Sequence, residues 1–346
     1  MLTLPPIPPL DHEAQQQAES RQARLTKPAG ALGQLEALSI RLAGMTGRID
    51  WLPERRAVVV CAGDHGVVAQ GVSAFPQDVT RQMVLNFLNG GAAVNVLARQ
   101  VGARVTVVDT GVIGEFDDHP DLVKGKIAPG TADFTQGNAM SPEEADGAIR
   151  LGVDVAAREV ERGLDILAVG EMGIGNTTSA SAIIAAITGR PPADVTGRGT
   201  GLHDAGLAQK ISVIERALQG HDPAHEDTLI KIGGFEIGAM AGLMIGAAST
   251  RIPVVVDGLI STAAAMIAAQ LAPDAKNYMI AGHQSAEPGH SIALEFLGLT
   301  PLQHLDMRLG EGTGALLAIP VIEAAMRILQ EMATFDDAGV SERDDS

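Results

Sequence analysis

The sequence predicts an α/β protein with a doubly wound, mostly parallel sheet of the Rossmann type. From residue 51 onward, short β-branched runs alternate with longer Ala- and Leu-rich stretches at helical spacing. These short runs are continuously apolar, which is typical of parallel strands that are buried on both faces. Helical spacing without such runs occurs at both ends of the chain. We therefore predict a small helical domain from residues 1–50 and 315–346, and a large α/β domain from residues 51–314.

The terminal segments predict the elements of the small domain. Residues 1–11 are proline-rich and indicate an extended arm, and residues 12–47 indicate helices interrupted at Lys27–Gly33, which is too rich in glycine for a helix interior. A long helix is expected at about Ala315–Met332, packed on the N-terminal helices. The acidic tail from Thr334 is expected to be frayed or disordered.

The apolar runs predict the strands and the place of a ligand site. We expect a further short strand near Leu302–Leu305. Polar or glycine residues follow each of the five main runs, and ligands of open parallel sheets bind outside the carboxyl ends of the strands. The five runs are Ala57–Ala62, Arg104–Asp109, Asp165–Val169, Pro253–Asp257 and Tyr278–Ala281.

Composition restricts the partners. The 346 residues carry a formal net charge of −17, which argues against nucleic acid and against an anionic membrane surface. The apolar stretch Leu259–Ala272 is too short to span a bilayer, and the N-terminus has no signal-peptide pattern. The single cysteine, Cys61, is expected to be a buried core thiol. We expect a soluble cytoplasmic protein.

Two glycine-rich loops are candidates for binding an anion. Gly170–Thr178 (GEMGIGNTT) follows a predicted strand and precedes a helix, so its N–H groups and side chains can form an anion cradle. An ordinary strand-to-helix turn is the equally weighted alternative. The loop Gly197–Leu202 (GRGTGL) is weaker evidence. Lys210 beyond it is either a solvated helix charge or a side chain that reaches a phosphate or an acid.

Glu311 lies between two glycines before the C-terminal helix. An acid there is favoured by the helix dipole alone, which is the simpler interpretation. An apolar wall beside the carboxyl group would raise its pKa and allow it to act as a base near neutral pH. Ser73, Phe75 and Gln82 are candidates to face a pocket, and Phe75 either stacks on a flat ligand or fills the core.

The histidines do not form a metal-binding pattern. Asp64 and His65 follow a strand, but no HxxxH, CxxC or carboxylate triad accompanies them, and His283, His290 and His304 are scattered. Capping and structural hydrogen bonds are the expected roles of the histidines. We predict no catalytic metal and no cofactor.

Eight motifs occur in the order found in the nicotinate-nucleotide:dimethylbenzimidazole phosphoribosyltransferases, which this chain resembles from about Leu25 to about Ala325. One such motif is weak evidence, but eight in order are highly specific. They are KPAGALGQLE, GDHGVVAQGVSAFPQDVT, GEMGIGNTTSASA, GRGTGL, KIGGFEIGAMAG, VVVDGLISTAAA, AGHQSAEPGH and LDMRLGEGTGA.

The resemblance implies an enzyme that moves 5-phosphoribose from nicotinate mononucleotide to 5,6-dimethylbenzimidazole, and it implies a homodimer. It also implies that Glu311 is the general base and that Glu171 and Lys210 are further functional residues. The substrate-binding residues expected at these motifs are Ser73, Phe75, Gln82, Met172, Gly173, Ile174, Gly175, Asn176, Thr177, Thr178, Gly201, Ser285, Leu309 and Gly310.

Two other functions are compatible with such a fold. One is a non-catalytic nucleotide sensor, for which Glu311 would be dispensable. The other is a different glycosyl-transfer or sugar-phosphate enzyme, which would not bind benzimidazole. Glu311 within LGEGTG favours an enzyme, and the ordered set of motifs favours this transferase.

Overall fold

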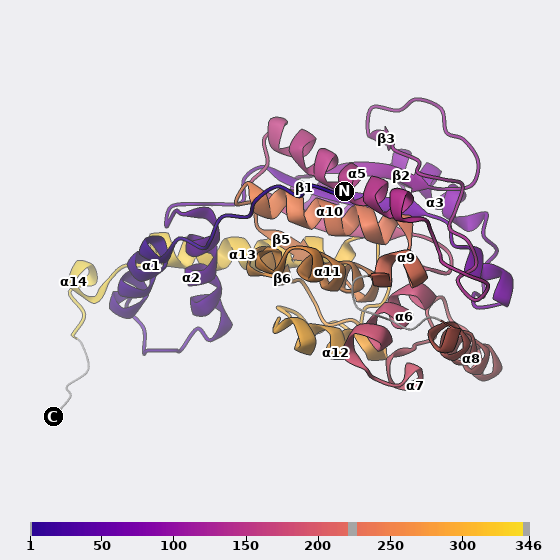
Figure 1. The fold of residues 1–346 in the computed structure, drawn as a ribbon. Helices are drawn as coiled ribbons and strands as arrows, with labels where there is room; N and C mark the ends of the chain where they lie inside the picture. The colour runs from indigo at the N-terminus through magenta and orange to yellow at the C-terminus, as the bar shows by residue number, and fades with distance from the viewer. Residues whose placement is uncertain (1, 221–226, 342–346) are drawn as a thin grey trace.

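A six-stranded, all-parallel sheet forms the centre of the molecule (Figure 1). The structure is a computed structural model that describes residues 2–220 and 227–341. The strand order is β3-β2-β1-β4-β5-β6, the order of doubly wound dinucleotide-binding sheets, so the predicted fold class is confirmed. The strands are β1 Arg56–Gly63, β2 Ala103–Gly111, β3 Leu122–Lys124, β4 Ile166–Met172, β5 Val254–Val256 and β6 Met279–Ala281.

Five of the predicted strands are confirmed within a few residues, and two details differ. Strand β3 was not predicted, because this edge strand has only three residues and none of them is buried. The strand predicted at Leu302–Leu305 is wrong. That segment runs beside β6, where Leu302 donates its N–H to Ala281 O at 3.1 Å, but it forms only an isolated bridge between Gln284 and His304.

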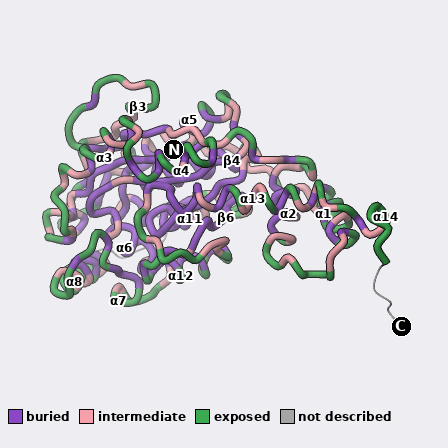
Figure 2. The backbone as a smooth tube through the Cα atoms, turned by 180° about the vertical axis from the view of Figure 1, so that it is seen from behind, coloured by how far each residue is buried: buried purple, intermediate pink, exposed green. Residues whose placement is uncertain are grey.

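Helices cover both faces of the sheet. On one face, α5 (Pro142–Glu161) packs on α10 (Phe235–Ser249), which packs on α11 (Leu259–Leu271). On the other face, α4 (Ala93–Val101) packs on α13 (Thr313–Glu331). Figure 2 shows this central region as buried. Cys61 in β1 is 1% exposed, as predicted for a core thiol, and burial raises its pKa.

Further helices complete the large α/β part of the molecule. The helix α6 follows β4 directly and packs on α11, α12, α7 and α8, which lie together below the sheet in Figure 1. The elements are η1 Gly66–Gln70, α3 Val79–Leu88, α6 Asn176–Thr188, α7 Pro192–Val195, α8 Asp204–Gly220, α9 Thr228–Ile232, η3 Pro273–Tyr278 and α12 Pro288–Leu297.

Segments from both termini lie together at one end of the molecule (Figure 1). The helices α1 (His12–Arg24) and α2 (Gln34–Thr46) pack on each other and on α13, and Leu25 forms a bridge with Thr334. The helix α13 begins against β4 and β5 and runs out to α1 and α2. The domain boundary predicted at residue 315 therefore falls within one continuous helix.

The acidic tail is partly ordered. Thr334 caps the short helix α14 (Phe335–Ala338) by accepting the N–H of Asp337 at 3.1 Å, whereas the frayed tail was predicted to start at Thr334. A local cap of this kind is favourable for Thr even in a short helix. Residues 342–346 of the predicted tail lie outside the described residues.

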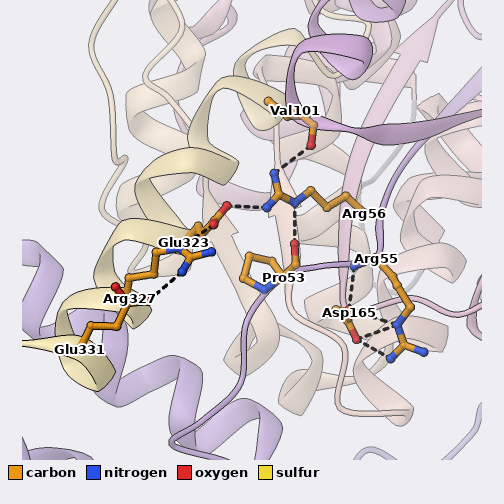
Figure 3. Close-up of polar contacts among 8 residues, drawn as sticks. All are labelled: Pro53, Arg55, Arg56, Val101, Asp165, Glu323, Arg327 and Glu331. Carbon is orange, nitrogen blue, oxygen red and sulfur yellow. Dashed lines mark hydrogen bonds and ion pairs between the residues drawn. The ribbon is translucent and has the colours of Figure 1, made fainter.

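Ion pairs connect the outer half of α13 to the start of β1 (Figure 3). Arg56 donates to Glu323 and to Val101 O, the latter at 2.8 Å. Arg327 pairs with Glu323 at 2.8 Å and with Glu331 at 2.7 Å. Arginines therefore surround Glu323 and lower the pKa of its carboxyl group.

The helix α13 is also the one helix of the described chain that is long and apolar enough to cross a membrane. However, 56% of its apolar window is buried within the fold, where it packs on α2, α4 and the sheet. Burial of this kind is typical of the core helix of a globular protein.

Candidate active site

A cavity of about 410 Å³ opens at the carboxyl ends of β4, β5 and β6, and the segment Phe75–Met83, which follows β1, also lines it. It lies where the strand order reverses between β1 and β4, the position at which doubly wound sheets bind ligands. A hollow of about 680 Å³ lies beside β3 and α5, but none of the glycine motifs lines it. The smaller cavity is therefore the candidate site.

Glu171 is the last carboxylate of β4 and lines the cavity floor. Its side chain accepts a hydrogen bond from the amide of Asn176, at the start of α6. Burial raises the pKa of Glu171 to about 8, and the negative charges of Asp257, Glu236 and Glu311 add to this, while the Asn176 hydrogen bond opposes it. These surroundings favour the protonated form of Glu171.

Glu311 stands beside Glu171 on a tight turn. Its backbone has φ +64°, and the flanking Gly310 and Gly312 have φ +86° and +85°. A methyl group at Gly310 would lie 2.1 Å from Oε1 of Glu171, and one at Gly170 would lie 2.4 Å from the carbonyl carbon of Glu311. Glycine at both positions therefore lets the two glutamates approach each other.

The carboxyl group of Glu311 is largely sheltered from solvent. Its Oε2 accepts the backbone N–H of Val94 at 3.2 Å, at the start of α4. Burial raises its pKa, the charge of Asp257 adds to this, and the Val94 hydrogen bond opposes it. In contrast to Glu323, no cation forms an ion pair with Glu311 within the described residues.

Asp257, directly after β5, fixes the turn that carries Glu311. Its Oδ1 accepts the N–H groups of Gly314 at 2.7 Å and Ala315 at 3.0 Å, and its Oδ2 accepts that of Gly312 at 3.2 Å. These are N–H groups of the first turn of α13, which have no intrahelical acceptor. Asp257 thus caps α13 from a neighbouring strand and holds the backbone that directly follows the base candidate.

One wall of the cavity is apolar. Phe75 contributes to it and is 50% exposed, which excludes the interpretation that it fills the core. The other apolar residues come from α3, from the start of α11 and from the segment before Glu311. They are Val79, Met83, Leu259, Ile260 and Leu309.

The opposite end of the cavity is polar and carries two cations. Arg308 lines it and donates to Gly199 O at 2.8 Å. Lys210 lies just behind, fully buried, and its Nζ donates to Thr177 Oγ1 at 2.8 Å and to Gly197 O at 3.3 Å. Burial lowers the pKa of Lys210 to about 8, although the charge of Glu287 opposes this. Lys210 is therefore not a solvated helix charge.

The Gly170–Thr178 turn already uses several of its donors. Ile174 N–H bonds Thr80 Oγ1 at 3.0 Å, and the N–H groups of Asn176 and Thr178 bond carbonyls within the turn at 3.1 and 2.9 Å. An anion at this turn would therefore depend on the remaining N–H groups and on side chains such as Thr177.

Sequence and structure comparisons assign this arrangement to a family. A family model described as phosphoribosyltransferase matches residues 7–340. The nicotinate-nucleotide–dimethylbenzimidazole phosphoribosyltransferase of Chloroflexus aggregans is 60% identical over 99% of this chain and 98% of its own length. The chain belongs to this phosphoribosyltransferase family. A protein of the same name from Roseiflexus is 57% identical over 98% of this chain and 97% of its own length.

A solved structure agrees with this assignment. The crystal structure of the enzyme of that name from Thermus thermophilus has a TM-score of 0.92 and 49% identity, and the match covers 96% of this chain and all of that chain. The resemblance predicted from the ordered motifs is therefore confirmed, and the chain is a phosphoribosyltransferase.

Most of the residues predicted for this phosphoribosyltransferase site lie together. Glu171 and Glu311 line the cavity, as do nine residues predicted to bind substrate. These are Phe75, Met172, Gly173, Ile174, Asn176, Thr177, Ser285, Leu309 and Gly310.

Other predicted residues lie outside the cavity lining. Ser73 bonds the backbone of Phe75, with its Oγ 3.0 Å from Phe75 O, and Gln82 is exposed on α3. Thr178 is buried inside α6. Three more do not line the cavity either: Gly175, Gly201 and, behind Thr177, Lys210.

His65 and His290 make structural hydrogen bonds, as predicted, whereas Nδ1 of the buried His283 has no hydrogen-bond partner. His65 Nε2 lies 2.7 Å from Glu236 Oε1 and its Nδ1 3.1 Å from Ser179 Oγ, all of them buried. His290 holds Ser285 by accepting its N–H at 2.7 Å. Within residues 2–220 and 227–341, no group of three His, Cys, Asp or Glu side chains is arranged to hold a metal ion.

Sequence reasoning missed several residues of the site. Asp257 follows β5, although it was predicted as the end of that strand. His283 and Glu287 follow β6 and line the cavity, whereas His283 was expected to be structural and Glu287 was noted only within a motif. The position of DG and GHQSAE after strands was the available signal. Arg308, two residues before Gly310, was equally visible. No local pattern indicated that Val94 N–H meets Glu311.

Proposed function

We propose that this phosphoribosyltransferase moves 5-phosphoribose from nicotinate mononucleotide to 5,6-dimethylbenzimidazole, giving α-ribazole 5′-phosphate and nicotinate. The relatives that match over their full length carry the name of this activity. The observation that carries the proposal is the pair of buried carboxyl groups, Glu171 and Glu311, beside an apolar wall at the carboxyl edge of the sheet.

Glu311 acts as the general base. When the free ring nitrogen of the benzimidazole attacks C1′, the ring becomes cationic and must lose the proton on its other nitrogen. A carboxylate whose pKa is raised by burial accepts that proton better near neutral pH than an exposed one does. Such a base contributes about two to four powers of ten in rate.

Glu171 supports this role because it is protonated. With a pKa of about 8 it is largely neutral at pH 7, so it leaves the negative charge on its neighbour Glu311. As a neutral acid it also donates a hydrogen bond, to Glu311 or to the substrate. Two adjacent carboxyl groups in one apolar site therefore divide into one acid and one base.

The stereochemistry follows from placing the two rings on opposite faces of the sugar. Attack opposite the departing nicotinate inverts C1′ and converts the β-linked donor into an α-linked product. The donor supplies its own leaving group, so the proposed route needs neither a metal nor a cofactor. The remaining rate enhancement comes from holding the two reactants in line.

The two ends of the cavity bind different parts of the reactants. The flat base lies against Phe75, Val79, Met83 and Leu309. The phosphate lies at the polar end, near the Gly173–Thr178 turn, Gly199–Gly201 and Arg308, where Lys210 holds the Thr177 hydroxyl in place. Ser73 and Gln82 belong to the segment that borders the apolar wall.

The assembly and compartment are part of the same proposal. The enzyme works as a homodimer in the cytoplasm. Large apolar side chains that are exposed in the single chain, such as Leu85 on α3 and Val96 on α4, support self-association. Sedimentation equilibrium tests the dimer, and a monomer at micromolar concentration would reject it.

Identification of the product tests the proposed reaction. The purified protein is incubated with nicotinate mononucleotide and 5,6-dimethylbenzimidazole, and the product is assigned by NMR, including its anomeric configuration. We expect equal amounts of nicotinate and an α-linked riboside phosphate. A β-linked product would contradict the inversion, and the absence of turnover would contradict the activity.

A further inference from the structure

Glu287 is a buried carboxylate of the cavity without a hydrogen-bond partner. It lines the cavity and is only 6% exposed. It immediately precedes α12, yet its side chain does not cap that helix. Its Oε2 is buried without a partner, and no ion pair reaches the side chain within the described residues. Because buried polar atoms are nearly always paired, this carboxylate requires a donor that is not part of the protein fold.

The nearest parts of the protein do not supply that donor. Lys210 is close enough to influence Glu287 electrostatically, but its Nζ bonds Thr177 Oγ1 and Gly197 O instead. Gly197 packs against the carboxylate so closely that a methyl group there would lie 1.8 Å from Oε2. The backbone N–H of Glu287 donates to Ser285 Oγ at 3.4 Å. This bond does not involve the carboxylate, which remains without a partner.

The position of Glu287 relates it to the sugar. It adjoins the Gly197–Leu202 loop, and Gly199 and Thr200 of that loop line the polar end of the cavity with Arg308. The phosphate is proposed to bind at this end and the reacting base at Glu311. The ribose links the phosphate to the base that reacts at Glu311, so we expect it to lie between these two places, beside Glu287.

We propose that Glu287 accepts hydrogen bonds from the ribose hydroxyl groups of the phosphoribosyl donor and makes the cavity selective for ribose over deoxyribose sugars. This inference rests on the proposed function. A carboxylate is an acceptor only and can take both hydroxyls of a vicinal diol. It repels the phosphate, and the ring N–H of the benzimidazole is assigned to Glu311, so among the donor groups of the two reactants the diol is left for Glu287.

Equilibrium binding is the appropriate measurement. Removal of the 2′-hydroxyl by itself speeds cleavage of a glycosidic bond, so rates would mix chemistry with recognition. Calorimetry without the acceptor base gives Kd for nicotinate mononucleotide and for its 2′-deoxy and 3′-deoxy analogues. The proteins are the wild type, Glu287→Gln, Glu287→Ala and the control Glu295→Gln, which changes an exposed carboxylate on the same helix.

The expected result is a loss of ribose recognition and nothing else. The wild type and Glu295→Gln bind each deoxy analogue roughly 10- to 100-fold more weakly than the ribose compound, as expected for hydrogen bonds to a charged group. Glu287→Ala binds the ribose compound that much more weakly and no longer distinguishes the analogues. Glu287→Gln lies between the two, and the KM for dimethylbenzimidazole stays within about twofold in both variants.

Two results would overturn the inference. One is a wild type that binds both deoxy analogues as tightly as the ribose compound, a test that does not depend on any variant folding. The other is a folded Glu287→Ala protein that keeps the wild-type preference. If instead the wild type fails to make an α-linked riboside phosphate, the proposed function has failed and not this assignment alone.

Discussion

The two ends of α13 place a glutamate in opposite surroundings. Near its start, Glu311 is 6% exposed, has no ion-pair partner among the described residues and has a raised pKa. Along its outer half, Glu323 pairs with Arg56 and Arg327 and has a lowered pKa (Figure 3). Both residues are glutamates, one on the turn that begins α13 and one within the helix, and their different surroundings separate a reactive carboxyl group from a structural one.

The two ends also differ in backbone conformation. The Glu323 end is regular helix, and its charges lie three or four residues apart or reach β1. The Glu311 end requires three consecutive residues with positive φ, and Asp257 holds the last of them, Gly312, together with the start of α13. A reactive carboxyl group therefore depends on an unfavourable local conformation that the rest of the fold imposes.

The largest expected effect comes from replacing Glu311 by glutamine. Glu311→Gln should lower kcat by about two to four powers of ten, because the proton acceptor is lost, and should leave Tm nearly unchanged. Steady-state kinetics and thermal melting measure both quantities. A loss of activity below about tenfold would remove Glu311 from the role of base.

A smaller loss is expected when the support of Glu311 is removed. Asp257→Asn should lower kcat by roughly 10- to 100-fold and should cost about 1–2 kcal/mol of stability, because α13 loses its cap. The charge of Asp257 raises the pKa of Glu311, so the acidic limb of the pH–rate profile should move to lower pH. An unchanged profile in a folded variant would mean that Asp257 acts on stability only.

The pH dependence should report both carboxyl groups. The base must be ionised, so activity should be lost as pH falls through the pKa of Glu311, which lies above its ordinary value of 4.5. Glu171 must be protonated, so activity should fall again as pH rises through about 8. In Glu171→Gln the basic limb should disappear, and a wild-type profile that is flat from pH 7 to 9 would reject the role of Glu171.

The same shift gives a stability prediction for Glu171. The pKa of Glu171 is raised in the folded state. Its contribution to the free energy of unfolding is therefore fully present below pH 4.5 and is lost as pH rises through about 8. Glu171→Gln should therefore raise Tm at pH 9 more than at pH 5. An equal Tm difference at both values would contradict the buried neutral acid.

The smallest effect is expected at the outer end of α13. Glu323→Gln should cost about 1 kcal/mol or less and should leave kcat unchanged, because its ion pairs are partly exposed. Its pKa is lowered, so the contribution is present above pH 4.5 and is lost as pH falls through the folded-state pKa. Denaturant titrations at pH 7 and at pH 3 measure the change in the free energy of unfolding. A large fall in kcat would contradict a purely structural role of Glu323.

The sequence predicted the parts of the site that directly follow a strand or lie between two glycines. Glu311 and the carboxyl edge of the sheet were visible in this way. Glu171 was named only through the resemblance to the family. The burial of Lys210 was not, because a lysine on an amphipathic helix gives the same pattern whether its Nζ meets water or Thr177.

Contacts between distant segments were the least predictable. The hydrogen bond from Val94 to Glu311 and the cap that Asp257 places on α13 join segments far apart in the chain. The edge strand β3 escaped detection because a three-residue strand carries no periodicity. Such features arise from tertiary packing, which local residue patterns do not encode.

The most direct test of Glu311 as the base uses an acceptor that has no proton to lose. In 1,5,6-trimethylbenzimidazole a methyl group replaces the ring N–H, and the other nitrogen can still attack C1′. Glu311→Gln should lower kcat by at least about 100-fold with 5,6-dimethylbenzimidazole but by no more than about threefold with the methylated base. An equal loss with both bases would show that the carboxylate acts through its charge and not as a proton acceptor.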